Sequence, residues 1–402
     1  MPNSQSIGTA VAQLYNTFPF PPDPLSDSPP PGYNWRWNWI TAYNFCTGRT
    51  PQRQNIRILD AGCGTGSGTD YLIHLNPEAE VVAIDLSDKA LEVAKERCRR
   101  SGVLANHTPP VKFLQMSVEE AAQLPGTFDL INCVGVLHHL PEPAVGMRAI
   151  ASKLAPGGLL HVFVYAELGR REIRLMQEAI SLLQGERCGD YPDGVRIGRK
   201  VFASLPENNL IVKQEKERWA LENHRDEAFA DMYVHPQEID YNIGSLFELI
   251  EASGLEFVGF SNPQFWQLDR LIGKDPELLE RSRNLGERDR YRLIELLDPT
   301  ITHYEFFLTR PPLEKVDWSK DEELQNAIPE RSPCLEGWPS RHLFDLNYQL
   351  VDVSESEFAF LQACGENPER GATVEEILKE IELDLDGARS LQQRQLILLS
   401  PR

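Results

Sequence analysis

The sequence predicts an α/β fold built on a parallel sheet, and three observations support this prediction. An apolar run over residues 56–59 ends in Asp60 and leads into a glycine-rich turn. A second apolar run ends in Asp85, about twenty residues past the turn, which is the spacing of a strand–turn–helix–strand unit that holds a nucleoside. Runs of strand type then recur, which gives seven predicted strands: 56–60, 81–85, 111–115, 128–134, 159–165, 255–260 and 303–308.

The glycine turn favours a cationic nucleoside over a dinucleotide. Glycines allow a ligand to approach the backbone, because a Cβ atom would block it. In a dinucleotide fingerprint counted from Gly62 or Gly64, the last glycine is replaced here by serine or threonine. A helix N-terminus suits a pyrophosphate, whereas the acid Asp60 at the strand end suits a cation. The alternative is an ordinary strand-to-helix turn with additional glycines.

Two motifs resemble the class I S-adenosylmethionine (SAM) methyltransferases. The pattern Asp60-x-Gly-x-Gly-x-Gly66, followed by Asp85 at the next strand end, is similar to the first motif of that family. After the fourth strand, the residues VLHHLPEP over 136–143 are similar to a signature of one large subgroup. The resemblance covers roughly residues 55–310. It implies SAM as cofactor and a Rossmann-like seven-stranded SAM methyltransferase fold whose last strand runs antiparallel.

The same resemblance implies a set of cofactor contacts. In the family, the first acid faces the amino group of the methionyl part, and the second acid binds the ribose. An acid that meets the adenine amine usually follows the third strand, but Ser117 and Val118 occupy the matching positions, so Ser117 or a backbone group would replace it. The predicted cofactor-binding residues are Tyr15, Asp60, Gly62, Gly64, Gly66, Asp85, Leu86, Ser117, Val118 and Cys133.

Composition excludes several classes of protein. The formal net charge of −20 argues against a large nucleic-acid interface, and we interpret the arginines at 170, 171 and 174 as a solvated helix face. Seven scattered cysteines without a C-x-x-C pair predict neither a disulfide framework nor a metal site, and they fit a reducing cytoplasm. We predict no signal peptide and no membrane span. The oligomeric state stays open.

An N-terminal arm over residues 1–54 is expected to be helical near residues 7–15 and extended where prolines are dense. Its tryptophans would be costly to leave in water, so the arm must lie on another surface. Two interpretations stay open. The arm is either a lid over the cofactor, with Tyr15, Tyr33 or Arg36 reaching the ligand, or it packs on the flank of the sheet.

Two further parts extend the 55–310 methyltransferase domain. A helical insertion over residues 168–235 falls at the carboxyl ends of the strands, where open sheets bind ligands, and we predict that it recognises the substrate. Residues 311–402 predict a small α+β, winged-helix-like domain, with capping boxes at Ser354 and Thr373. Its second helix is acidic, which favours docking of a protein or dimerisation over DNA binding.

Methyl transfer from SAM is an in-line displacement, so much of the catalysis can come from positioning, and a base is needed only for a weak nucleophile. The candidate catalytic residues are His138 and His139 after the fourth strand, and Tyr233 and His235 at the end of the insertion. The alternatives are a turn element for the histidine pair and a structural hinge for the other two.

A narrower resemblance concerns the acceptor. The arm LYNTFPFPPDPL, the segment DMYVHPQEIDYN and the strand THYEFFL look similar to bacterial protein methyltransferases with an added domain, and to phycobiliprotein asparagine methyltransferases. This resemblance implies a protein substrate, namely an asparagine amide of a phycobiliprotein β subunit. The N-P-P-Y type of amide motif is absent, since Asn132 is followed by Cys-Val-Gly, so other groups would hold an amide. The alternatives are a small-metabolite methyltransferase and a non-catalytic SAM-binding scaffold.

Overall fold

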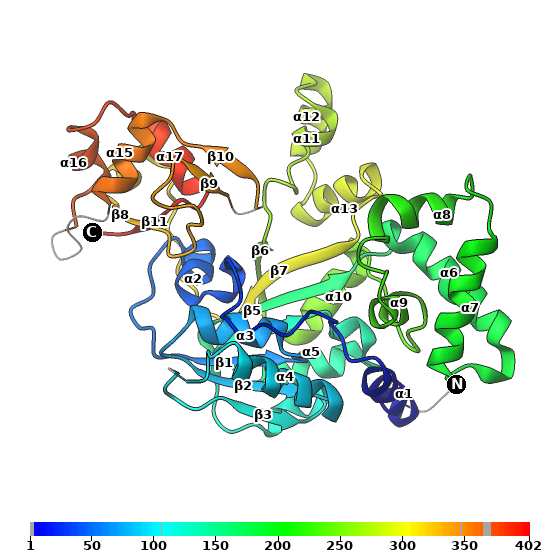
Figure 1. The fold of residues 1–402 in the computed structure, drawn as a ribbon. Helices are drawn as coiled ribbons and strands as arrows, with labels where there is room; N and C mark the ends of the chain where they lie inside the picture. Colours follow the sequence, from blue (N-terminus) through cyan, green and yellow to red (C-terminus); the bar gives the residue numbers. More distant parts are fainter. Residues whose placement is uncertain (1–3, 106, 346–347, 365–370) are drawn as a thin grey trace.

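The computed structural model describes residues 4–105, 107–345, 348–364 and 371–402, and within them a seven-stranded sheet forms the centre (Figure 1). Its order is β3-β2-β1-β4-β5-β7-β6. Strand β7 runs antiparallel to β5 and β6, and the other pairs are parallel. The Rossmann-like seven-stranded fold is thus confirmed. The strands are β1 (Arg57–Ala61), β2 (Glu80–Asp85), β3 (Lys112–Gln115), β4 (Phe128–Val134), β5 (Leu154–Tyr165), β6 (Glu256–Phe260) and β7 (His303–Thr309).

Helices cover both faces of this sheet, so its strands are apolar on both sides. One face packs Ile58, Leu130 and Leu159 against helices α2 (Trp39–Thr47), α3 (Ser67–Leu75) and α4 (Asp88–Arg100). The other face packs Leu59, Ile131 and Leu160 against α5 (Pro143–Ala151), α10 (Ile243–Ser253) and α13 (Glu287–Leu297). The alternation of successive residues between these two cores fixes which strand residues can face the site.

Strand β5 begins earlier than predicted. It starts at Leu154 instead of residue 159, because residue 154 already pairs with Phe128 of β4. The register then shifts before Leu130 pairs with Leu159, and Gly157 takes a positive φ of 72° inside the strand. The glycines there accommodate a bulge in place of a loop.

The arm contains more helix than its prolines predict. Helix α1 (Ser4–Thr17) is followed by an irregular path, a 3-10 helix (η1, Trp35–Trp37) and α2. Asn38 caps α2 because its side chain accepts the Thr41 N–H, and Gly48 ends it with a φ of 70°. The extended prediction is therefore wrong for the tryptophan-rich part, where a local cap overrides the nearby prolines.

The insertion is helical, and it packs against α1. Its helices enclose a separate apolar core to which Leu14 of α1 contributes. Arg170 is buried beside Glu238, so the interpretation of its cluster as a solvated helix face is wrong for this residue. The insertion comprises η4 (Leu168–Arg170), α6 (Arg171–Gln184), η5 (Gly185–Arg187), α7 (Tyr191–Ser204), α8 (Leu210–Gln214), the π-helix η6 (Glu215–Trp219) and α9 (Asp226–Tyr233).

Four other short helices belong to this half of the chain: η2 (Val118–Gln123), η3 (Leu137–His139) and, in the excursion between β6 and α13, α11 (Asp269–Ile272) and α12 (Pro276–Arg283). No helix of the described residues is long and apolar enough to cross a membrane.

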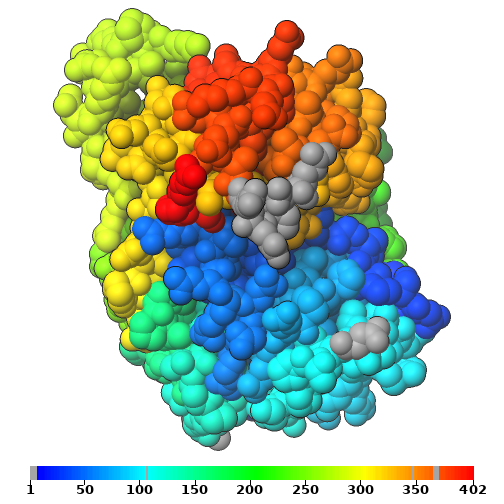
Figure 2. All heavy atoms as spheres, turned by 90° about the vertical axis from the view of Figure 1, so that its left-hand side faces the viewer, coloured from blue at the N-terminus to red at the C-terminus, as the bar shows by residue number. Residues whose placement is uncertain are grey.

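The C-terminal unit has its own apolar core and rests on the arm, as Figure 2 shows for the orange and red residues above the blue ones. Asn44 of α2 donates to the Leu399 carbonyl at 2.7 Å. The predicted capping boxes at Ser354 and Thr373 are present, while helix α17 was not predicted. The elements are α14 (Asp321–Asn326), β8 (Ile328–Arg331), β9 (His342–Phe344), β10 (Leu350–Asp352), α15 (Glu355–Ala363), α16 (Val374–Leu378), α17 (Leu385–Gln393) and β11 (Ile397–Ser400).

Candidate active site

A cavity of about 870 Å³ opens at the carboxyl ends of the parallel strands. Its wall joins three parts of the chain that are distant in sequence: the glycine turn after β1, residues 20–24 of the arm, and residues 219–232 of the insertion. This is the edge at which open α/β sheets bind ligands. The volume falls in the range of ordinary small-molecule sites.

Two acids mark one end of the cavity. Asp85 accepts the Gly64 N–H and the Ser87 N–H, each at 2.8 Å, so backbone donors fix its carboxylate. Asp60 accepts from Asn132 at 2.9 Å and from Thr69 at 2.6 Å. Burial nevertheless raises the pKa of Asp60 to about 6. A cationic ligand would favour its ionised form.

The three glycines of the turn serve different purposes. A Cβ at Gly62 would meet Val136 at 2.3 Å, and one at Gly64 would meet the Phe20 carbonyl of the arm at 2.5 Å. Both residues line the cavity and take positive φ. Gly66 instead faces α4, where an added Cβ would meet Ala94 at 2.7 Å, and it is not part of the described cavity wall. The structure therefore places Gly66 at a helix contact, contrary to the predicted cofactor contact.

Leu86, Ser117 and Val118, three of the predicted cofactor-binding residues, line the cavity. The Ser117 hydroxyl caps η2 by accepting the Glu119 N–H at 3.2 Å. Cys133 does not meet its prediction, because its side chain lies in the core on the opposite face of the sheet. Its neighbour Asn132 faces the cavity instead, as the alternation of a strand requires.

The two interpretations of the arm each describe a part of it. Tyr15 and the segment 20–24 line the cavity, and the Phe20 carbonyl accepts the Thr65 N–H of the glycine turn at 3.0 Å. Tyr33 and Arg36 are not part of the described cavity lining. Trp37, which was not predicted, lines the cavity and donates to Asn132, the amide that donates to the first acid.

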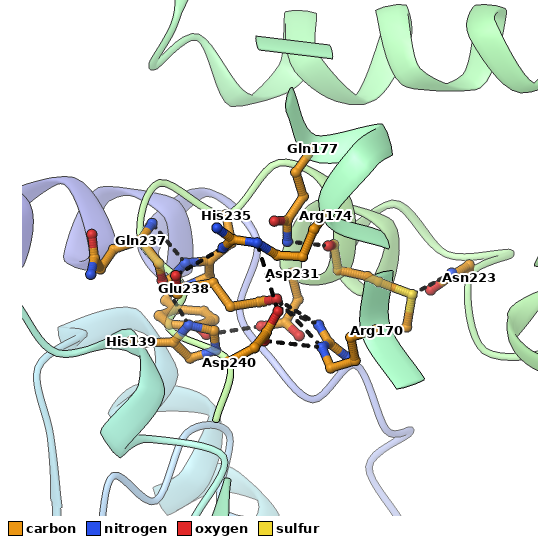
Figure 3. A network of polar contacts seen from close by, with 12 residues as sticks. His139, Arg170, Arg174, Gln177, Asn223, Asp231, His235, Gln237, Glu238 and Asp240 are labelled. Carbon is orange, nitrogen blue, oxygen red and sulfur yellow. Dashed lines mark hydrogen bonds and ion pairs between the residues drawn. The ribbon is translucent and has the colours of Figure 1, made fainter. Parts of the chain in front are cut away.

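Tyr15, His139 and Asp231 line the other end of the cavity, and Figure 3 shows the polar contacts around His139 and Asp231. His139 donates through Nδ1 to the Gln237 carbonyl at 2.9 Å, which leaves Nε2 as the acceptor of a neutral ring. Burial lowers the pKa of His139 to about 4, so it is neutral near pH 7. Tyr15 donates to Asp231 at 2.8 Å. Burial raises the pKa of that carboxyl to about 7.

The other predicted catalytic residues take different positions. His235 stacks on His139 with ring centroids 3.7 Å apart, and its Nε2 is buried without a hydrogen-bond partner among the described residues. His138 is fully buried and stacks on Tyr165, outside the described cavity lining. Tyr233 lies in the core of the insertion, where it donates to Glu215. Of the four predicted catalytic residues, only His139 is therefore part of the described cavity lining.

Several wall residues were not predicted, among them Tyr165, Arg170 and His303. Arg170 lies over the Tyr165 ring, 3.4 Å from its centroid, and pairs with Glu238 at 3.1 Å. Asp240 stands 3.7 Å from the same arginine, and burial raises its pKa. Figure 3 shows this ion-pair network directly beside His139. Tyr165 could have been predicted, because it stands at the carboxyl end of a strand. Arg170 could not, because the sequence does not distinguish a buried arginine from one on the surface.

Three of these groups could in principle hold a metal ion. Ligand atoms of His139, Asp231 and His235 lie within 4.8 Å of one another, which is a two-histidine, one-carboxylate set. However, His235 accepts the Gln237 N–H through Nδ1 at 3.1 Å, so the proton of its neutral ring sits on Nε2. A protonated nitrogen is no ligand, and the contacts favour hydrogen bonding here.

Comparison with known proteins bears on this site. A family model described as "Methyltransferase domain" matches residues 58–158, which include the glycine turn and both acids. The chain belongs to the class I SAM-dependent methyltransferases. Over 396 residues, this methyltransferase is 59% identical to "Uncharacterized protein syc1184_c" of Synechococcus sp. (strain ATCC 27144 / PCC 6301 / SAUG 1402/1). The match covers 98% of this chain and 94% of that protein.

A second relative of the methyltransferase is shorter. "Uncharacterized phycocyanin operon protein W" of Pseudanabaena tenuis (strain PCC 7409) is 73% identical over 92 residues, covering 23% of this chain and 87% of that protein. Among solved structures, PKMT2 from Rickettsia typhi matches 92% of this chain and 77% of its own, with a TM-score of 0.61 and 14% identity. At that identity the likeness supports the fold alone.

Proposed function

We propose that this methyltransferase transfers the methyl group of SAM to a side chain of a protein, with an asparagine amide of a phycobiliprotein β subunit as the acceptor. The observation that carries the proposal is that one cavity joins a pair of acids at the glycine turn to the His139–Asp231–Tyr15 cluster. The first end suits a cationic cosubstrate, and the second suits an acceptor that must lose a proton.

At the acid end, SAM would lie along the glycine turn. Asp85 is held by two backbone donors and retains free lone pairs for ribose hydroxyls. Asp60 would face the ammonium group of the methionyl part. A positive charge there offsets the desolvation that raises the pKa of Asp60, so binding of the cation and ionisation of the acid support each other. Residues 20–24 of the arm would exclude water from the cosubstrate.

At the acceptor end, His139 would act as the base. The nucleophilic nitrogen forms a bond to the methyl carbon as the carbon–sulfur bond breaks, and the electron pair of that bond goes to sulfur. The proton of the nitrogen passes to Nε2 of His139, whose Nδ1–H is anchored on the Gln237 carbonyl. The Asp231 carboxylate would stabilise the imidazolium that forms. An amide needs this help, because its nitrogen is a poor nucleophile.

A protein acceptor is supported by the surface of the insertion. Leu182 of α6 is 75% exposed, and Leu221, which adjoins the cavity wall residues Trp219 and Glu222, is 90% exposed. Exposed leucines offer apolar contact area to a protein acceptor, although single ones also occur on ordinary protein surfaces. The phycocyanin operon named for one relative supports the choice of a phycobiliprotein. We also place the enzyme in the cytoplasm, where its cysteines, all of them free, would stay reduced.

The test is a transfer assay with methyl-labelled SAM, using purified phycocyanin that lacks the modification and, separately, a fractionated cell extract. We expect label in the β subunit, and peptide mass spectrometry should find one added methyl group on an asparagine. Label in a different protein would replace the acceptor but keep the enzyme class. Label confined to small molecules would support a metabolite methyltransferase. Binding of SAM without any transfer would support a non-catalytic scaffold.

A further inference from the structure

A row of polar side chains crosses the buried sheet from the cavity toward β7. Asp60 of β1 is in register with Asn132 of β4, which is in register with His161 of β5. His161 in turn pairs with Phe307, and Glu305 lies two residues further along β7 on the same face. Positions of this kind in a covered sheet are normally apolar. The exposed fraction is 3% for Asp60 and Asn132 and 0% for His161.

The row makes a continuous chain of contacts from the arm to the cavity. Arg36 of the arm forms an ion pair with Glu305, with 2.7 Å between Nε and Oε2. The other Glu305 oxygen lies 3.1 Å from Nε2 of His161. Nδ1 of His161 lies 2.9 Å from Oδ1 of Asn132. Finally, Nδ2 of Asn132 donates to Oδ1 of Asp60 at 2.9 Å.

The orientation of the Asn132 amide is fixed from two sides. The indole N–H of Trp37, which can only donate, lies 2.9 Å from Oδ1. The Asp60 carboxylate requires a donor, and Nδ2 supplies it. A flipped amide would lose both contacts. The atom of Asn132 that faces His161 is therefore an oxygen.

The contacts of His161 require an additional proton. Both ring nitrogens face oxygen atoms, one of Asn132 and one of Glu305. A neutral imidazole carries one N–H, so a neutral ring would leave a lone pair against an oxygen at about 3 Å, whichever tautomer it adopts. The His161–Glu305 pair must hold a second proton.

The surroundings of Glu305 place that proton on the histidine. Arg36 pairs with its Oε2, and the Ser261 hydroxyl donates to the same oxygen at 2.7 Å. Burial favours the neutral acid, but Arg36 and His161 outweigh it and lower the pKa of Glu305 to about 2. Glu305 is thus the ionised partner.

Burial acts against a charged ring as well. It lowers the pKa of His161, an effect that the positive charge of Arg36 reinforces and Glu305 opposes. The two oxygen contacts decide the balance, because the neutral ring has no satisfied arrangement here. With His161 protonated, the charges alternate in sign along this row of contacts, from Arg36 through Glu305 and His161 to Asp60. They sum to zero, as buried charges require.

We infer that His161 is a buried imidazolium that acts as a positioning residue: through Asn132 it aims the ionised Asp60 into the cavity and couples docking of the Trp35–Trp37 turn to binding of the SAM cation. The Asn132 amide accepts from both Trp37 and His161, which polarises its N–H toward Asp60. Arg36 and Trp37 belong to the same turn, so the arm and the acid become parts of one network. The coupling to SAM rests on the proposed function, whereas the protonation state does not.

The protonation state can be tested by NMR on protein labelled with 15N-histidine. At pH 7.5 we expect both ring nitrogens of His161 to carry a directly bonded hydrogen in the wild type. In Glu305→Gln, where the side-chain amide can donate to a bare Nε2, one nitrogen should lose its hydrogen. The His161 signals are assigned as those missing from His161→Gln. A wild-type ring with one bare nitrogen would overturn the inference.

The coupling is tested by calorimetric titration with SAM and S-adenosylhomocysteine. Trp37→Phe keeps a ring but removes the indole donor, and we expect it and His161→Gln each to weaken binding on the order of tenfold. Because both act through one oxygen of Asn132, the double variant should weaken binding by less than the product of the two factors. The exposed His74→Gln serves as a matched control with unchanged affinity.

Failure of the proposed SAM site and failure of the coupling would give different results. If the wild type binds neither ligand, the proposed SAM site fails, and the NMR result still decides the charge of His161. If the wild type binds and each single variant binds as tightly as the wild type, the coupling is overturned. Multiplicative effects in the double variant would also contradict a shared path through Asn132.

Discussion

His139 and His235 stack with ring centroids 3.7 Å apart, and both are anchored on Gln237 in opposite senses. Nδ1 of His139 faces the Gln237 carbonyl, whereas Nδ1 of His235 accepts the Gln237 N–H. The two neutral rings therefore have opposite tautomers. His139 presents a bare Nε2, and His235 presents a protonated one. Of the two, only His139 belongs to the described cavity lining, so its bare Nε2 is the acceptor there, while His235 packs against its ring.

Loss of the acceptor nitrogen should affect chemistry and leave cosubstrate binding intact. For His139→Gln we expect kcat to fall by about 10²–10⁴-fold, the usual contribution of a positioned base. Affinity for S-adenosylhomocysteine should stay within about twofold, because the acid end of the cavity is unchanged. The measurement is steady-state kinetics together with calorimetry, with the exposed His74→Gln as control. Retention of kcat in His139→Gln would exclude His139 as the base.

The pH dependence of activity should report on Asp231. Burial, opposed by the Tyr15 hydroxyl, sets the pKa of this carboxyl to about 7. The ionised form stabilises the imidazolium, so kcat should rise as pH increases through 7. Tyr15→Phe removes a donor that favours the carboxylate, so the rising limb should move to higher pH, on the order of one unit. A limb that stays in place would contradict this assignment.

The Asp231 carboxyl should also make the folded protein less stable as pH rises, whereas activity increases over the same range. Its folded pKa lies above the ordinary value of 3.8, so its contribution is full below pH 4 and is lost as pH rises through 7. Asp231→Asn keeps an acceptor for Tyr15 and cannot ionise. We expect the variant to gain stability over the wild type between pH 4 and pH 8, on the order of a few kcal/mol, measured by urea unfolding. If the difference in unfolding free energy between the variant and the wild type stayed constant across this range, that would count against a buried, titrating acid.

The sequence allowed the acid end of the cavity to be predicted, because Asp60, Asp85 and two glycines lie in one short motif whose local geometry is nearly fixed. It did not separate Gly66 from them, since its contact with Ala94 depends on how α3 packs against α4. Cys133 was predicted to bind the cofactor, but it faces the opposite core, and the alternation with Asn132 along β4 could have corrected that prediction.

The acceptor end was harder to predict because its members come from separate elements. His139 follows β4, Asp231 lies on α9, and Tyr15 comes from α1, so only tertiary packing joins them. Tyr233 and Asp231 lie two residues apart on a helix and must face different directions. The network from Arg36 to Asp60 likewise depends on strand order, which places residues 132, 161 and 305 on neighbouring strands.

The contact between the glycine turn and the arm gives a further prediction. In Gly64→Ala, the new Cβ would lie 2.5 Å from the Phe20 carbonyl, so residues 20–24 must move away from the cavity. We expect weaker SAM binding and faster proteolytic cleavage in the arm. Gly102→Ala has a comparable positive φ of 80° but no atom within 4 Å of the new Cβ, so it controls for backbone strain. Equal proteolysis of the two variants would contradict docking of the arm on the turn.

Metal removal should leave the enzyme active, despite a cluster with the composition of a metal site. His139, Asp231 and His235 lie close enough to share an ion, but Nε2 of His235 carries its proton as long as Nδ1 accepts from Gln237. Binding a cation would break that hydrogen bond and compete with the one from Tyr15 to Asp231. We therefore expect unchanged kcat after dialysis against a chelator, and no increase in Tm with added Zn²⁺ or Mn²⁺. Activity lost on dialysis and restored by one of these ions would show that the cluster is a metal centre, and the proton would then have to leave by another route.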